Sequence, residues 1–131
     1  RWHLTQLPNN SKVVVWTATV HAARIQGELP YKPLGARLVD AGYRVASIGF
    51  TALAGESAMA GRPARRLPDL PASSLEARTS IGDIGWTFLA SSRLADVGAM
   101  PSRLLGKTVT APWHYYFDGV VVIRNEVAPT F

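Results

Sequence analysis

Five polar side chains of this chain are of the types that hydrolyse or bind a small molecule: His21, Arg24, Ser91, Ser92 and Arg93. A neutral imidazole can take a proton from water. An arginine guanidinium suits recognition of a carboxylate or an oxyanion. We therefore ask which elements could bring these five residues to one pocket.

The predicted strands place these side chains at one edge of a sheet. The run Lys12–Trp16 has three consecutive valines and a tryptophan, which is typical of a strand buried on both faces. His21 and Arg24 follow this run, and Ser91 follows a second predicted strand over residues 86–90. Open α/β sheets bind ligands outside the carboxyl edge, so we expect these residues to converge there. For His21, a buried histidine with satisfied hydrogen bonds remains the alternative.

The chain is predicted to form one α/β domain over residues 1–131. Pro33 favours the start of a helix and Gly42 its end. The following segment, residues 43–51, is predicted to be a strand, so residues 12–51 form a β-α-β unit with a right-handed crossover. With the strand over 86–90 and another over 117–124, we expect a mainly parallel sheet of about four strands with flanking helices.

The remaining segments are predicted to be short elements and loops. Residues 52–72 are rich in alanine, glycine, proline and arginine, and indicate a flexible loop or edge hairpin. Ser73 and Glu76 form a capping-box pattern at the start of a short helix that ends near Gly82. Residues 91–107 indicate a loop with one or two helical turns.

The predicted helices are too few to cover both faces of such a sheet, whose strands are apolar on each side. The first residues, RWHLTQLPNNSK, also read as the last turns of a helix. We therefore expect chain upstream, or a partner subunit, to supply the missing layer.

Composition excludes several classes of function. The 131 residues contain no cysteine, so disulfides, thiolate nucleophiles and cysteine-based metal sites are excluded. The net charge of +5 attracts anions only weakly, and the arginines at 62, 65 and 66 lack the interleaved aromatics of a nucleic-acid site. The longest mostly apolar run, residues 13–23, is shorter than the ~20 residues of a membrane span.

No cofactor is predicted. Gly55–Ala58 begins like a nucleophile elbow, but Met59 stands where that turn needs glycine. His3, His21 and His114 lack metal-ligand spacing. His114 comes just before the predicted strand over 117–124, at the amino edge of the sheet and away from the expected ligand site, so we expect it to pack between aromatic residues.

Four blocks in order resemble the carboxyl-terminal part of the erythromycin esterase-like family. Residues 12–16 match the family's KVVVW strand, and His21 falls on the second histidine of the motif that follows it. Residues 33–50 resemble its "MG-x-x-L-R" helix and "Y-x-x-I-G-F" strand. Residues 74–76 resemble a helix opening, and residues 117–130 resemble its terminal "FDALI" segment.

This resemblance implies hydrolysis of an ester, such as a macrolide lactone, by histidine-activated water and without a metal. His21 would act as acid or base, with Arg24, Ser91, Ser92 or Arg93 on the substrate. The amino-terminal half of such proteins, which carries a further histidine and acidic residues, would have to complete the site.

Two alternatives remain open. Ala18 stands at the position of the motif's first histidine and Thr19 at that of its asparagine, which favours a degenerate relative that binds a small molecule without hydrolysing it. The chain could also be a structural half-domain that completes a sheet with another chain.

Overall fold

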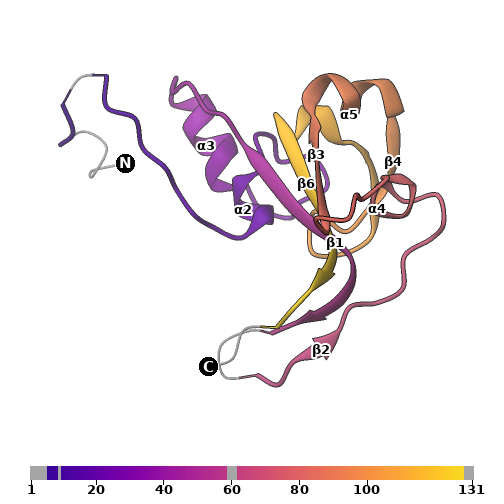
Figure 1. Ribbon diagram of the computed structural model, residues 1–131. Helices are drawn as coiled ribbons and strands as arrows, with labels where there is room; N and C mark the ends of the chain where they lie inside the picture. Colours follow the sequence, from indigo (N-terminus) through magenta and orange to yellow (C-terminus); the bar gives the residue numbers. More distant parts are fainter. Residues whose placement is uncertain (1–5, 9, 59–61, 129–131) are drawn as a thin grey trace.

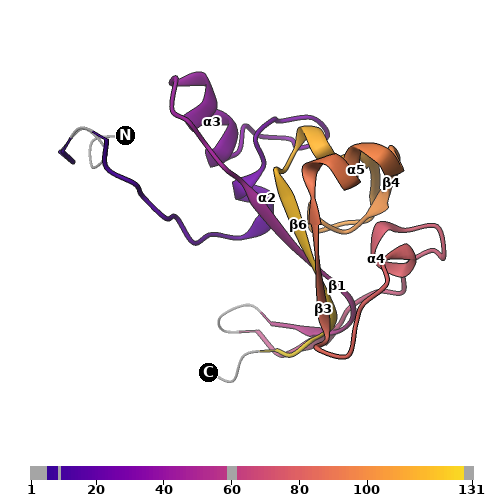
Figure 2. The same ribbon diagram turned by 45° about the horizontal axis from the view of Figure 1, so that its top comes forward.

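The computed structural model describes residues 6–8, 10–58 and 62–128, and these residues form a mixed α/β fold (Figure 1). Its helices and strands, in chain order, are α2 (Thr19–Ala22), α3 (Leu34–Asp40), β1 (Ile48–Ser57), β2 (Arg65–Arg66), α4 (Leu75–Arg78), β3 (Trp86–Ala90), α5 (Ser91–Val97), β4 (Ala99–Ser102), β5 (Val109–Pro112), the 3₁₀ turn η1 (Trp113–Tyr115) and β6 (Gly119–Glu126). In Figures 1 and 2, α2 and α3 lie on one side of β1, whereas α4, α5 and β4 lie on the other.

The described strands form a four-stranded sheet in the order β2-β1-β6-β3 and a separate β4-β5 hairpin. β1 and β6 are parallel, whereas β1–β2 and β3–β6 are antiparallel. The α/β prediction is therefore confirmed, and the mainly parallel sheet is wrong. Side chains alternate in the same way in both kinds of ladder, so an apolar run predicts a strand but not its direction.

The predicted strand over Lys12–Trp16 is wrong, and with it the β-α-β unit. Within the described residues, this segment pairs with no strand, and Val14 and Trp16 are 92% and 84% exposed. The backbone N–H and carbonyl oxygen of Phe50, on β1, are bound by a side chain: the Thr19 hydroxyl accepts from Phe50 N (3.1 Å) and donates to Phe50 O (3.0 Å). Strand propensity measures how side chains fit a sheet and supplies no partner strand.

Element boundaries were predicted unevenly. The helix between Pro33 and Gly42 is confirmed as α3, with Gly42 at a positive φ of 81° after its end. The strand predicted over residues 43–51 begins later, at Ile48, and continues to Ser57. Near its end, Gly55 pairs with Glu126 at a φ of 116°, close against that residue's backbone.

The predicted short helix begins one residue later and ends earlier than expected. Ser74, not Ser73, caps α4 by accepting from Ala77 N, and the helix ends at Arg78 rather than near Gly82. The predicted strand over 86–90 is confirmed as β3. The strand predicted over 117–124 is β6, which begins and ends two residues later, at Gly119 and Glu126. The helical turns predicted within 91–107 are α5, and that range also contains β4.

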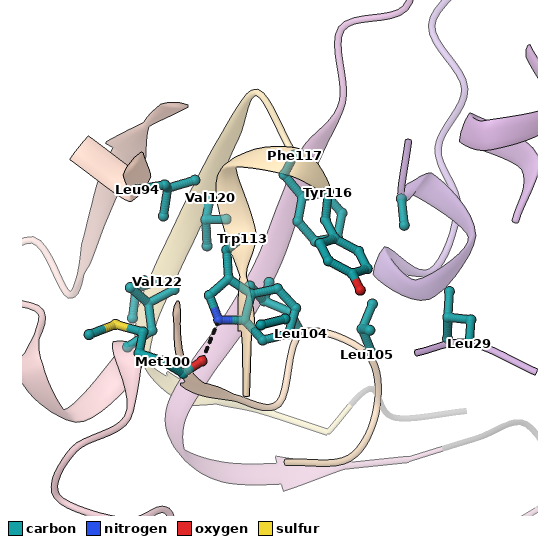
Figure 3. Packing of buried hydrophobic residues seen from close by; sticks show 13 residues of the cluster. Leu29, Leu94, Met100, Leu104, Leu105, Trp113, Tyr116, Phe117, Val120 and Val122 are labelled. Carbon is teal, nitrogen blue, oxygen red and sulfur yellow. Dashed lines mark hydrogen bonds between the residues drawn. The ribbon is translucent and has the colours of Figure 1, made fainter. Parts of the chain in front are cut away.

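The hydrophobic core covers one face of the sheet (Figure 3). Val120 and Val122 of β6 point into it and are fully buried beneath Trp113 and Leu94. The indole Nε1 of Trp113 donates to the carbonyl oxygen of Met100 at 2.8 Å, as the dashed line in Figure 3 marks. This bond joins η1 to β4, so the hairpin and the 3₁₀ turn pack as one layer over the sheet.

The opposite face of the sheet is apolar, and among the described residues no helix or strand layer covers it; we call it the bare face. The Trp16 ring, 84% exposed, touches its edge, with its centroid 5.5 Å from that of Phe50. The strand register aligns three rows across β1, β6 and β3, which are Ile48–Gly119–Ala90, Phe50–Val121–Phe88 and Ala52–Ile123–Trp86. The four large residues at the flanks of these rows remain half exposed: Ile48 38%, Phe50 40%, Trp86 48% and Phe88 47%.

Some predicted features fall outside the described residues. These are His3, most of the helical turns expected in the first ten residues, and residues 59–61 of the predicted loop over 52–72. Of that loop, residues 52–57 belong to β1 and 65–66 to β2, which agrees with the edge-hairpin form of the prediction.

Candidate functional site

His21 lies on the short helix α2 and not at the end of a strand. Its side chain is exposed, and its ring centroid lies 5.7 Å from that of Tyr31. Both expectations for His21, the carboxyl-edge position and the buried alternative, are therefore wrong. The cause is the absence of the strand over Lys12–Trp16, which leaves α2 anchored through Thr19 at the edge of β1.

Arg24 and Ser91 do come together, through Asp118. The Arg24 Nη1 donates to Asp118 Oδ1 at 2.5 Å, and the backbone N–H of Ser91 donates to the carbonyl oxygen of Asp118 at 2.9 Å. The other carboxylate oxygen, Oδ2, accepts from the backbone N–H of Ser47 at 2.8 Å. Asp118, which precedes β6, is thus bonded to Ser47, which precedes β1, and to Ser91, the first residue of α5.

The place of this convergence differs from the prediction. Ser47 and Asp118 directly precede the two parallel strands β1 and β6, so the cluster lies at their amino ends. Residues that follow β3 reach this edge because β3 runs antiparallel to β6. Ser92 and Arg93 lie exposed on α5, and among the described residues no hydrogen bond joins their side chains to His21 or Arg24.

A hollow of about 430 Å³ lies beside this cluster, lined by Arg24, Ile25, Val39, His114 and Tyr115; we call it the arginine hollow. The residues come from the segment after α2, from α3 and from η1. The predicted packing of His114 between aromatic residues is confirmed in part: its ring centroid lies 4.0 Å from that of Tyr115, the one aromatic ring recorded against it among the described residues.

Two residues that line the arginine hollow each have a buried side-chain nitrogen without a hydrogen-bond partner among the described residues: Arg24 Nε and His114 Nδ1. Sequence reasoning placed His114 at the amino edge and therefore away from the expected ligand site. The structure shows that Arg24 also lies at the amino edge, because it bonds to Asp118 just before β6. The sequence pattern does not give the strand directions from which this could be predicted.

A buried polar cluster around Glu76 was also missed. Glu76 is fully buried, and its Oε1 accepts from Thr51 Oγ1 (2.6 Å), Ser102 Oγ (2.6 Å) and Arg103 N (3.0 Å). These bonds join α4, β1 and the end of β4. The capping-box pattern assigned Glu76 to the first turn of a helix, and no signal in the sequence indicated its partners.

The described residues contain no group of three or more histidine, cysteine, aspartate or glutamate side chains that could hold a metal ion. None of the helices in the described part of the chain is both long and apolar enough to cross a membrane. No protein-family model matches the chain, and neither a curated protein nor a solved structure does.

Proposed function

We propose that this chain is the carboxyl-terminal portion of an erythromycin esterase-like hydrolase, which cleaves an ester or lactone with histidine-activated water. The resemblance of the four sequence blocks supplies the reaction class. One structural observation supports the rest of the proposal: among the described residues the bare face is apolar and has no covering layer, as expected if further polypeptide completes the domain.

The size of the bare face can be estimated. Large apolar and aromatic side chains have on the order of 200 Å² of surface each, so the exposed fractions of Ile48, Phe50, Trp86 and Phe88 leave roughly 350 Å² of apolar surface in water. At about 25 cal/mol per Å², covering it contributes roughly 9 kcal/mol. This term favours a layer of further polypeptide over the sheet, supplied by upstream chain or by a second chain.

The chain by itself supplies only part of a hydrolytic site. The imidazole of His21 is exposed on α2, so it is accessible to a residue or a substrate delivered by the covering layer. A general base also needs a group that orients it. Ala18 and Thr19, at the other two motif positions, cannot do so as histidine and asparagine would, and the covering layer would have to supply that group.

The test is hydrolysis of a macrolide lactone and of a nitrophenyl ester by the natural polypeptide that contains this chain. His21→Ala should lower kcat by about 10² to 10⁴-fold, the usual contribution of a general acid or base. Arg78→Ala, an exposed residue on α4, is the control and should leave kcat unchanged. An unaltered rate in His21→Ala would refute the catalytic role of that imidazole.

A second candidate, binding without hydrolysis, is favoured by Ala18 at the first motif position. It predicts that the same polypeptide binds the lactone in equilibrium dialysis and returns it chemically intact. Detection of the ring-opened product by mass spectrometry would exclude this candidate.

A further inference from the structure

We propose that the arginine hollow is a binding site for a small organic carboxylate with an apolar body. The proposal rests on the residues that line the hollow and not on hydrolysis, so it stands or falls separately from the proposed function.

The first argument is the state of Arg24. A guanidinium carries five N–H donors, and Asp118 takes one of them, at Nη1. The edge formed by Nε and Nη2 is the one on which a carboxylate binds with two parallel hydrogen bonds. On that edge, Nε is buried and has no acceptor among the described residues. A buried donor without a partner costs free energy, which a carboxylate would recover when the Arg24 side chain turns this edge toward the hollow.

The second argument is the chemistry of His114. His114 lines the same hollow, and its Nδ1 is likewise buried without a partner in the described part of the chain. Its imidazole can donate to an anion from a protonated nitrogen. The exposed Tyr115, whose ring packs on His114, adds a phenol at the rim.

The remaining lining residues determine which kind of ligand body fits beside the carboxylate. Ile25 and Val39 contribute only aliphatic surface, and a volume of about 430 Å³ lies within the ~300–1,000 Å³ range of small-molecule pockets. Asp118, which is 35% exposed and already paired with Arg24, disfavours dianions such as phosphate. A monocarboxylate on a ring or a branched chain fits this combination of groups.

The experiment is titration of the full chain with benzoate, followed by NMR of the His114 and Tyr115 ring resonances. Benzamide has nearly the same shape without the charge and is the matched ligand control. We expect saturable shifts of both rings with benzoate and at least about tenfold weaker binding of benzamide, as loss of a charge-assisted hydrogen bond implies.

Two variants test the named groups. Arg24→Gln and His114→Phe should each weaken benzoate binding by about tenfold, whereas Arg78→Gln, an exposed arginine on α4, should not change it. If Arg24→Gln fails to fold without its Asp118 bond, His114→Phe decides. Equal affinity for benzoate and benzamide, absence of saturable shifts, or equal losses in His114→Phe and Arg78→Gln would overturn the proposal.

Discussion

Replacing Glu76 by alanine should destabilise the fold by about 3 kcal/mol. The side chain is fully buried, and its Oε1 accepts three hydrogen bonds from Thr51, Ser102 and Arg103. Each of the three donors would lose its acceptor, at a cost of about 1 kcal/mol each. Removal of the side chain also leaves a cavity, although it relieves the cost of burying a carboxylate.

Two further variants separate the loss of these hydrogen bonds from the effect of removing any glutamate. Glu76→Gln keeps an oxygen that can accept from the same donors but buries an amide N–H₂ without a partner, so we expect a loss of about 1–2 kcal/mol. Glu56→Ala removes an exposed glutamate from β1 and should stay within about 0.5 kcal/mol of wild type.

The assay is urea unfolding of the three variants and wild type, followed by tryptophan fluorescence and by far-UV circular dichroism. The urea concentration at the unfolding midpoint should be highest for Glu56→Ala, lower for Glu76→Gln and lowest for Glu76→Ala, at similar m-values. A stability of Glu76→Ala equal to that of Glu56→Ala would refute the claim that this carboxylate joins α4 to β1 and β4.

Three other substitutions give specific expectations for stability, all measured by the same urea unfolding curves. Asp118→Ala removes the acceptor of Arg24 and of the Ser47 N–H and should cost about 2 kcal/mol, and a loss below that of Glu56→Ala would contradict the anchoring role of Asp118. Gly55→Ala places a Cβ 2.1 Å from the Glu126 carbonyl oxygen at a φ of 116° and should cost about 3 kcal/mol or more. In Gly119→Ala the added Cβ would lie 2.3 Å from the end of the half-exposed Phe88 ring and 3.3 Å from Ile48 Cδ1. Both are ends of side chains that can turn aside, so a cost as large as that of Gly55→Ala would show that the bare face is rigidly packed.

The sequence predicted those elements whose signals are local. Pro33 and Gly42 bounded α3, and the β-branched and aromatic runs located β3 and β6. The first run of this kind, over Lys12–Trp16, failed because its side chains fit a strand while no neighbouring strand is available to it among the described residues.

The candidate site was predicted only in part, because it depends on strand direction. Arg24 and Ser91 were expected at one edge, and both contact Asp118, but at the amino ends of β1 and β6. His114 was set aside because it precedes β6, although this position is what brings it beside Arg24. Long-range pairings such as that of Glu76 with Thr51 leave no periodic trace in the sequence.

The most direct test of the proposed domain organisation is hydroxyl-radical footprinting of Phe50, Trp86 and Phe88. It compares the isolated chain with the natural polypeptide or assembly that contains it, with Ile84, 72% exposed beside the sheet, as reference. If a further layer covers the bare face, the three aromatic residues should be oxidised in the isolated chain and protected in the natural form. Equal oxidation of all three in both samples would contradict the account.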